Sequence, residues 1–288
     1  MTAPTVERRA PPPGPDLLAE RLVATYRELD SLARTDGLEP GEPANRAFTE
    51  LVGLCDHRPG PVATAVLEDP RVAAIAGRLR RLCSAGEYRL ERSWAGRIAT
   101  ADDADLELRS FPYLANYRAL VALEMGTVTG LLAGPPGRAC VLGSGPLPLT
   151  ALLLAGRMNC AVDAVDLEPE ATALARDVLR RLTGGGLVRP WQADAAAFDG
   201  EAEADIVLLA ALVGLDPLAK RTVISAVVDR MRPGALLLVR TAYRLRTLLY
   251  PLLTADDLIA AGGGRLRPLA QVHPFGDVVN SFVVAART

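Results

Sequence analysis

Two groups of acidic and phenolic side chains have the spacing of a proton-transfer site. Glu87 and Glu91 are four residues apart, so they lie one turn apart on one face if the segment is helical. Tyr113, Tyr117 and Glu124 also recur at helical spacing, on a face that is otherwise apolar. A carboxylate among apolar side chains has a raised pKa, which suits a group that accepts a proton. The sequence therefore predicts a base among the three glutamates.

Each of these side chains also has a structural interpretation. The first two glutamates could form surface ion pairs with Arg89 or Arg92. The tyrosines could be core aromatic residues with satisfied hydroxyls. Glu124 could pair with an arginine between two structural units. The residue types alone leave these alternatives open.

A second set of residues stands where strands of an α/β sheet are expected to end. After an apolar run at 139–142 comes a turn whose glycines let a ligand approach the backbone. This turn contains Gly143, Ser144, Gly145 and Pro146. Asp166 ends the next run, where an acidic side chain binds ribose hydroxyls, and Asp194 follows the third run, where a carboxylate can accept from an adenine amino group. Ala210 and Leu212 close the fourth run with small or apolar side chains suited to a pocket wall.

These residues predict a nucleoside site rather than a dinucleotide site. The turn continues with Pro-Leu-Pro where a pyrophosphate-binding turn has x-x-G, and no basic side chain suits a pyrophosphate. S-adenosylmethionine is therefore favoured as the ligand. Taken singly, the glycines could form an ordinary tight turn and the two aspartates could cap helices. Their order at successive strand ends favours the ligand.

The elements that must position these residues change character near residue 133. Residues 16–132 lack β-branched alternation and carry apolar residues at helical spacing, beginning with Leu18 and Leu22 behind a candidate N-cap, Asp16. Asp69 followed by Pro70 predicts another helix start. We therefore expect an all-helical N-terminal domain at 16–132. The proline-rich residues 1–15 are expected to be a disordered leader.

From 133 to 288, short apolar runs alternate with helical stretches, which predicts an α/β fold with a parallel, doubly wound sheet. Strands are expected at 139–142, 161–165, 188–191, 206–210, 235–239, 269–272 and 282–285, and helices at 169–182 and 219–231. The last two runs are joined without room for a helix, so an antiparallel strand is expected at the end of the sheet.

Composition excludes several other classes of protein. The 288 residues are 50% hydrophobic with a formal net charge of −2, which argues against a general nucleic-acid binder. The longest apolar stretch, 206–215, is too short to cross a bilayer, and no signal pattern opens the chain, so a cytoplasmic location is expected. Four widely spaced cysteines and two histidines predict no metal site and no disulfide framework.

Five stretches of the chain, in one order, resemble the nicotianamine synthases and related metallophore synthases. They are Phe111-Pro112-Tyr113-Leu114-Ala115-Asn116-Tyr117 leading to Leu123-Glu124; Gly143-Ser144-Gly145-Pro146-Leu147-Pro148-Leu149-Thr150; Leu208-Leu209-Ala210-Ala211-Leu212-Val213-Gly214; Arg240-Thr241-Ala242 with Leu249-Tyr250-Pro251; and His273-Pro274 with Val278-Val279-Asn280-Ser281. The resemblance covers roughly residues 80–288, and several motifs in one order make it specific.

The resemblance implies a class I methyltransferase-like Rossmann domain at 133–288 beneath the helical domain. It also implies transfer of the 3-amino-3-carboxypropyl group of S-adenosylmethionine to an amine, with release of methylthioadenosine and without a metal. Glu87 is then expected to be the catalytic base and Tyr113 to orient the nucleophile or the donor. A shift of four residues, onto Glu91 and Tyr117, stays open.

The acceptor side is where this chain departs from the family pattern. Leu114 and Tyr243 stand where plant members have tyrosine and histidine, so the acceptor stays open between an S-adenosylmethionine-derived unit and an amino acid. Arg240 could clamp a substrate carboxylate or pair with Asp205 or Asp229. The residues expected to bind substrate are Glu91, Asn116, Tyr117, Glu124, Arg240, Tyr250, His273 and Asn280, although His273 before a proline also suits a structural loop.

Two other functions stay open. One is an ordinary methyltransferase with the same donor site, and the other is a non-catalytic protein that binds the metallophore. The expected partner is a small-molecule amine or amino acid, with neither nucleic acid nor membrane, and a homodimeric assembly stays open.

Overall fold

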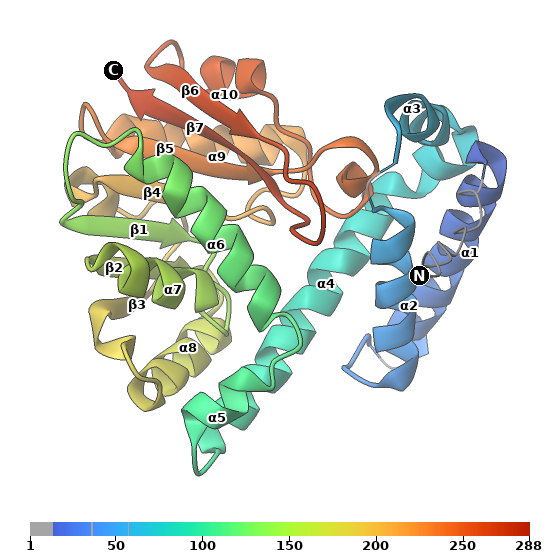
Figure 1. The fold of residues 1–288 in the computed structure, drawn as a ribbon, viewed down its shortest axis with the longest axis horizontal. Helices are drawn as coiled ribbons and strands as arrows, with labels where there is room; N and C mark the ends of the chain where they lie inside the picture. Colours follow the sequence, from blue (N-terminus) through green and yellow to red (C-terminus); the bar gives the residue numbers. More distant parts are fainter. Residues whose placement is uncertain (1–13, 36, 57) are drawn as a thin grey trace, which may run out of the picture.

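The computed structural model describes residues 14–35, 37–56 and 58–288, which form a helical half and a half built on a sheet (Figure 1). Most of the expected leader, residues 1–13, lies outside the described residues. The first helix already begins at Pro15. Asp16 therefore lies inside its first turn and is not the N-cap, because proline suits the first helical position.

The first half of the chain is helical throughout its described residues, as its periodicity predicts. Its helices are α1 (Pro15–Thr35), α2 (Glu42–Leu54), α3 (Gly60–Glu68), α4 (Pro70–Thr100), α5 (Ala104–Arg109) and α6 (Leu114–Thr129). Leucines of α1, α2 and α4 share one buried cluster, which contains Leu18, Leu22, Leu51 and Leu79. The apolar stripes read from the sequence therefore face one another.

Helix α4 joins the two halves of the molecule (Figure 1). It begins where the sequence predicts, because the Asp69 side chain accepts a hydrogen bond from the Arg71 amide and Pro70 follows it. With 31 residues it is about 45 Å long. Its first part packs against α1, and its last part packs against α8 (Pro169–Arg181) through Ala95 and Ile98. The middle of α4 therefore lies between the two halves.

The second half contains a seven-stranded sheet in the order β3-β2-β1-β4-β5-β7-β6. Its strands are β1 (Arg138–Leu142), β2 (Ala161–Asp166), β3 (Val188–Gln192), β4 (Ile206–Leu209), β5 (Leu236–Thr241), β6 (Leu266–Val272) and β7 (Ser281–Arg287). The first five run parallel, and β7 runs antiparallel to both β5 and β6. The expected antiparallel strand at the end of the sheet is therefore confirmed.

Helices cover both faces of this sheet (Figure 1). They are α7 (Leu149–Met158), α8 (Pro169–Arg181), α9 (Pro217–Arg230) and α10 (Ala255–Ala261). α9 and α10 pack on one face, and α6 and α7 pack on the other, where Val121 and Met125 of α6 enter the core. The fold class, a class I methyltransferase-like Rossmann sheet preceded by helices, is confirmed. The domain boundary at residue 133 stays a prediction.

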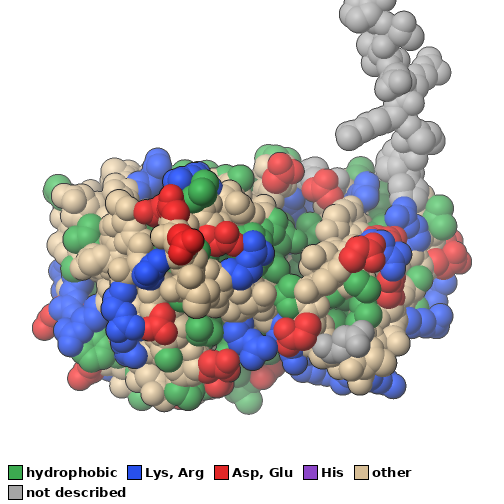
Figure 2. Space-filling model, turned by 90° about the horizontal axis from the view of Figure 1, so that it is seen from below, with side chains coloured by type: hydrophobic (Ala, Val, Ile, Leu, Met, Phe, Trp, Pro, Cys, Tyr) green, Lys and Arg blue, Asp and Glu red, His purple; other side chains and the backbone are tan. Residues whose placement is uncertain are grey.

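The strand order reverses between β1 and β4, which is the switch point where open α/β sheets bind ligands. Acidic and basic side chains are interspersed over the face in Figure 2, and hydrophobic side chains are visible in the depression between the two halves. In the described part of the chain, none of the helices has the length and apolar character needed to span a bilayer.

Candidate active site

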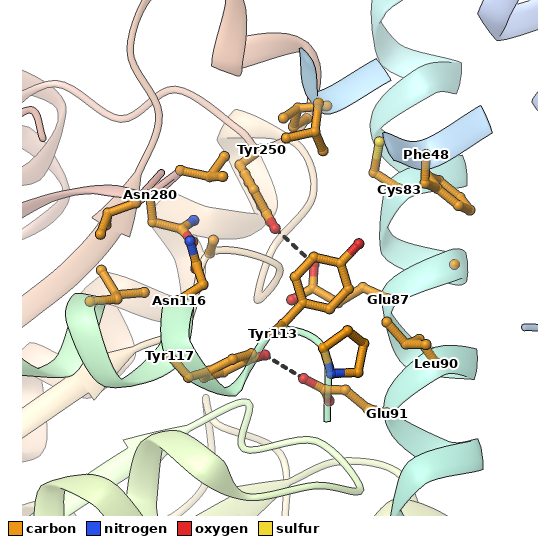
Figure 3. Close-up of a pocket in the computed structure, with 18 of the residues that line it drawn as sticks. Phe48, Cys83, Glu87, Leu90, Glu91, Tyr113, Asn116, Tyr117, Tyr250 and Asn280 are labelled. Carbon is orange, nitrogen blue, oxygen red and sulfur yellow. Dashed lines mark hydrogen bonds between the residues drawn. The ribbon is translucent and has the colours of Figure 1, made fainter. Parts of the chain in front are cut away.

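A cavity of about 710 Å³ lies between the helical half and the carboxyl ends of the central strands. Its walls come from α2, the middle of α4, the start of α6, the turns after β1 and β4, the end of β5 and the loop before β7. The expected site residues that line it are Glu87, Glu91, Tyr113, Asn116, Tyr117, Gly143, Ser144, Ala210, Leu212, Arg240, Tyr250 and Asn280 (Figure 3). Residues far apart in the sequence therefore meet in one cavity.

Two carboxylates project into this cavity from one face of α4 (Figure 3). The Tyr250 hydroxyl donates a hydrogen bond to Glu87 Oε2 at 3.0 Å, and the Tyr117 hydroxyl donates one to Glu91 Oε1 at 2.5 Å. Neither glutamate forms an ion pair within the described residues. The alternative pairing with the neighbouring arginines is wrong, because Arg89 and Arg92 turn outward to other acids.

The environment of this pair makes both carboxylates unusually basic. Burial raises the pKa of Glu87, and the hydrogen bond from Tyr250 opposes that effect only in part. Burial raises the pKa of Glu91 well above its ordinary value, and the charge of Glu87 one turn away acts in the same direction. Two carboxylates one helical turn apart, both with little access to solvent, disfavour double ionisation. The pair can therefore take up and release a proton.

Tyr113 differs from the other two tyrosines of the cavity. It is the residue before α6, its side chain is 40% exposed, and its hydroxyl has no hydrogen-bond partner within the described ranges. Burial and the charge of Glu87 raise the pKa of Tyr113, so its hydroxyl stays protonated. The free hydroxyl beside the carboxylate pair is available to a ligand (Figure 3).

The third candidate base, Glu124, lies below the cavity and does not line it. It is fully buried, and both its oxygens accept hydrogen bonds from Arg240, at 2.7 Å from Nε and 2.9 Å from Nη2. The alternative pairing of Arg240 with Asp205 or Asp229 is wrong, because these two acids pair with Arg232 and Arg265 instead. Glu124 therefore forms the ion pair with an arginine that the sequence left open as its structural role.

The glycine turn after β1 lies against one carboxylate of the pair, Glu91. Gly143 and Gly145 have φ values of +79° and +69°, which favour glycine. A Cβ at Gly143 would lie 2.3 Å from Val213 Cγ2, and one at Gly145 would lie 2.5 Å from Glu91 Oε2. The amides of Gly143 and Ser144 donate to the Val165 carbonyl oxygen, which ties the turn to β2. A side chain at Gly145 would therefore occupy the space of the Glu91 carboxylate, and one at Gly143 would overlap Val213.

The remaining predicted donor-site residues do not line the cavity, and their nucleoside contacts stay predictions. Asp166 Oδ2 accepts from the Gly145 amide at 2.8 Å, and Oδ1 accepts from Glu168, so the aspartate supports the turn. Asp194 accepts from the Ala196 amide, as a capping residue does. Pro146 is likewise absent from the cavity wall.

His273 lies outside the cavity as well. Its ring stacks on Tyr243 with centroids 4.1 Å apart, and its Nδ1 is 2.9 Å from Ser281 Oγ. Burial and the charge of Arg244 lower the pKa of His273. These contacts fit the structural interpretation of this histidine, and they keep it away from the carboxylates.

Two residues that shape the cavity were missed by the sequence analysis. Buried Arg246 donates to the carbonyl oxygens of Gly276 at 2.5 Å and Val278 at 2.6 Å, and so holds the loop that carries Asn280. No sequence spacing connects it to that loop. Phe48 of α2 packs on Gly86, where a Cβ would lie 2.3 Å from the ring. A glycine inside a helical stretch was the available signal.

No group of three or more histidine, cysteine, aspartate or glutamate side chains suited to a metal ion occurs among the residues that the structure describes. All four cysteines are buried and unpaired.

Sequence comparison places the chain among known proteins. The family model for nicotianamine synthase protein matches residues 15–288. Nicotianamine synthase 9 of Hordeum vulgare is 35% identical over 271 residues, which are 92% of this chain and 76% of that protein. Nicotianamine synthase 2 of Oryza sativa subsp. japonica is 35% identical over 276 residues, covering 94% of this chain and 82% of that protein.

Solved structures share the fold. MtNAS in complex with MTA and tNA has a TM-score of 0.80 at 24% identity and covers 93% of this chain and 97% of its own. A variant of MtNAS in complex with S-adenosylmethionine has a TM-score of 0.75 at 23% identity, covering 94% and 96%. Because the family model spans nearly all the described residues and the plant relatives exceed 30% identity, the chain belongs to the nicotianamine synthase family.

Proposed function

We propose that the protein transfers the 3-amino-3-carboxypropyl group of S-adenosylmethionine to an amine and releases methylthioadenosine. The observation that carries this proposal is a pair of carboxylates at the cavity wall that form no ion pair within the described residues, one of which, Glu91, lies against Gly145 of the turn after β1. Membership of the nicotianamine synthase family supports it. So do the ligands of MtNAS, which are MTA, tNA and S-adenosylmethionine.

The donor site in this proposal is the strand-end half of the cavity. The Gly143–Ser144 turn and the Ala210–Leu212 wall hold the adenosyl group, with Asp166 and Asp194 as its ribose and adenine contacts. The sulfonium has three neighbouring carbons that an amine could attack, so the pose of the donor selects the product. Here the Cγ methylene points towards α4, and residues 16–132 act as the cap over residues 133–288.

The acceptor amine must lose a proton before or during attack, because an aliphatic amine with a pKa of about 10 is mostly protonated at neutral pH. Glu87 accepts this proton, and Tyr113 orients the nucleophile with its free hydroxyl. The amine nitrogen forms a bond to Cγ while the Cγ–S bond breaks. The electron pair stays on sulfur, which becomes the neutral thioether of methylthioadenosine.

The acceptor is an amine, either an S-adenosylmethionine-derived unit or an amino acid. A cavity of about 710 Å³ is large enough for the donor and an acceptor of this size together. Glu91, bonded by Tyr117, lies beside Glu87 and binds the cationic group of the acceptor before the proton moves.

Product analysis tests the proposal. The protein is incubated with S-adenosylmethionine alone and then with single amino acids or amines, and the nucleoside product is identified by mass spectrometry. Methylthioadenosine is the expected product. S-adenosylhomocysteine would instead identify a methyltransferase. Tight binding of nicotianamine without any nucleoside product would identify a metallophore-binding protein.

A further inference from the structure

The guanidinium group of Arg240 is only partly used by the protein. Its Nε and Nη2 donate to the two oxygens of Glu124, at 2.7 and 2.9 Å. Its Nη1 has no hydrogen-bond partner among the residues that the structure describes, and Arg240 lines the cavity. A guanidinium has five N–H donors in a fixed plane, so the engaged edge leaves the other edge for a further acceptor.

A second unused donor belongs to Asn280. Its side chain is only 9% exposed, lines the same cavity, and has an Nδ2 without any hydrogen-bond partner in the described chain. Buried amide groups in native proteins are normally paired, because an unpaired donor loses its hydration without compensation. An orphaned amide at a cavity wall therefore points to a ligand as the missing partner.

The sheet register places these two donors side by side. Arg240 of β5 pairs with Phe282 of β7, and residues 280 and 282 of an extended chain point to the same face. Asn280 directly precedes β7, so its continuation of the strand places it diagonally from Arg240, and Figure 3 shows its side chain beside Asn116 of α6. Glu124 already cancels the formal charge of Arg240. Two residues that line the cavity, Arg240 and Asn280, thus carry N–H donors without a hydrogen-bond partner in the described chain, and such a pair suits a carboxylate.

The opposite wall of the cavity carries the complementary chemistry. Glu87 and Glu91 form no ion pair within the described residues, and they line the same cavity as Arg240, whose positive charge offsets part of the rise that burial causes in their pKa values. One wall thus suits an ammonium group and the other a carboxylate group. A ligand that carries both groups on neighbouring atoms is an α-amino acid.

We propose that Arg240 Nη1 and Asn280 Nδ2 form a subsite for the α-carboxylate of an amino-acid group whose amino group lies towards Glu87 and Glu91. This inference rests on the proposed function, which supplies two sources of such a group. One source is the aminocarboxypropyl arm of S-adenosylmethionine, and the other is an amino-acid acceptor. The shared chemistry is an α-amino acid moiety.

Pairs of ligands that differ only in this carboxylate separate the two sources. For the donor, calorimetry compares the affinity of S-adenosylmethionine with that of decarboxylated S-adenosylmethionine. For the acceptor, kcat/KM for methylthioadenosine release is compared between histidine and histamine, and between 2,4-diaminobutyrate and 1,3-diaminopropane. The wild-type protein prefers the carboxylate-bearing member of the relevant pair by about tenfold or more, as one charge-assisted hydrogen bond predicts.

Asn280→Leu removes the orphaned donor, and Asn280→Asp replaces it by an isosteric acid that repels a carboxylate. Asn280→Leu is expected to abolish the preference and Asn280→Asp to reverse it. The Tm of Asn280→Leu should stay equal or rise, because the Nδ2 has no hydrogen-bond partner among the described residues. If the variants lose the preference in the donor pair, the subsite binds the carboxylate of the aminocarboxypropyl arm of S-adenosylmethionine. If they lose it in the acceptor pairs, the subsite binds the carboxylate of the acceptor.

Unchanged preferences in both pairs, in either variant, would overturn the subsite. The calorimetric comparison needs no turnover, so it tests the subsite even if the wild-type protein released no methylthioadenosine. That last result would refute the proposed function and leave the subsite to be judged by the donor pair alone.

Discussion

The glutamate between α6 and β5 and the two glutamates on α4 have opposite surroundings. Glu124, between α6 and β5, gives both its oxygens to Arg240 and has no exposed surface. Glu87 and Glu91 on α4 face a cavity, accept side-chain hydrogen bonds from tyrosines alone within the described part of the chain, and have raised pKa values because of burial. Burial is common to both regions. The difference lies in whether a cation compensates the charge.

This difference separates a structural acid from a candidate base. A carboxylate held by both arms of an arginine has its charge cancelled and its lone pairs occupied, so it accepts a proton poorly. A carboxylate that only tyrosines support keeps its negative charge in a low-dielectric site and gains from meeting a cation or a proton. Mutations in the two regions should therefore have different signatures.

The largest effect is expected at Glu87. Glu87→Gln should reduce methylthioadenosine release by about 10²–10⁴-fold, the usual loss when a general base is removed. Its Tm should not fall, because the amide oxygen still accepts from Tyr250. Exposed Glu50, which pairs with Arg21, offers a matched control, and Glu50→Gln should leave the rate unchanged. Retention of the wild-type rate within tenfold would remove Glu87 from the mechanism.

At the Glu124–Arg240 ion pair, a mutation should lower the stability of the fold. Glu124→Gln leaves the Arg240 guanidinium buried without its counter-ion, which should cost about 3–5 kcal/mol of unfolding free energy. Urea denaturation measures this loss. The double variant with Arg240→Met should recover most of it, because no uncompensated charge remains. A loss below about 1 kcal/mol would mean that the pair is not the structural element described here.

A smaller effect is expected where the glycine turn meets the carboxylate pair. Gly145→Ala adds a Cβ only 2.5 Å from Glu91 Oε2 at a φ of +69°, so it should displace Glu91 and raise the KM for S-adenosylmethionine about tenfold. Gly234 has a φ of +84° and open space around it. Both Gly145→Ala and Gly234→Ala should lower the unfolding free energy by about 1–2 kcal/mol, because both residues have a positive φ, but Gly234→Ala should leave the KM unchanged. Equal KM effects in both variants would argue against the contact.

The smallest effect concerns pH. Burial raises the pKa of Glu91 in the folded protein well above the ordinary value of the unfolded chain, so the folded state binds this proton more tightly. The resulting stabilisation is complete below the ordinary pKa and is lost as pH rises through the raised pKa. Glu91→Gln removes this loss and keeps an acceptor for Tyr117. Its Tm should equal that of the wild type near pH 4 and exceed it increasingly towards pH 8. A constant difference across this range would contradict the raised pKa.

Local patterns predicted most of the secondary structure and one motif of the site. The apolar runs became the strands, Asp69–Pro70 started α4, and the glycines after β1 formed a turn at the switch point. These features depend on backbone preferences and on period, which are properties of a few neighbouring residues. Such local patterns place helix ends less exactly, since Asp16 was expected to be the N-cap, whereas α1 already begins at Pro15.

Long-range contacts decided which candidates share a cavity. Spacing had grouped Glu124 with Tyr113 and Tyr117, but the fold turns Glu124 to Arg240 and brings Tyr117 to Glu91 from another helix. Nothing near Arg246 in the sequence indicates that it holds the loop before β7.

The amino-acid sequence by itself determined the order of strands and helices, the glycine turn and the family. Each of these can be recognised from short stretches of residues that are neighbours along the chain. Only the tertiary structure decided which buried glutamate has a cation beside it. That choice depends on charges that meet across elements more than one hundred residues apart, as Glu124 and Arg240 do. The pKa of a buried acid follows from the charges and hydrogen bonds packed around it in space.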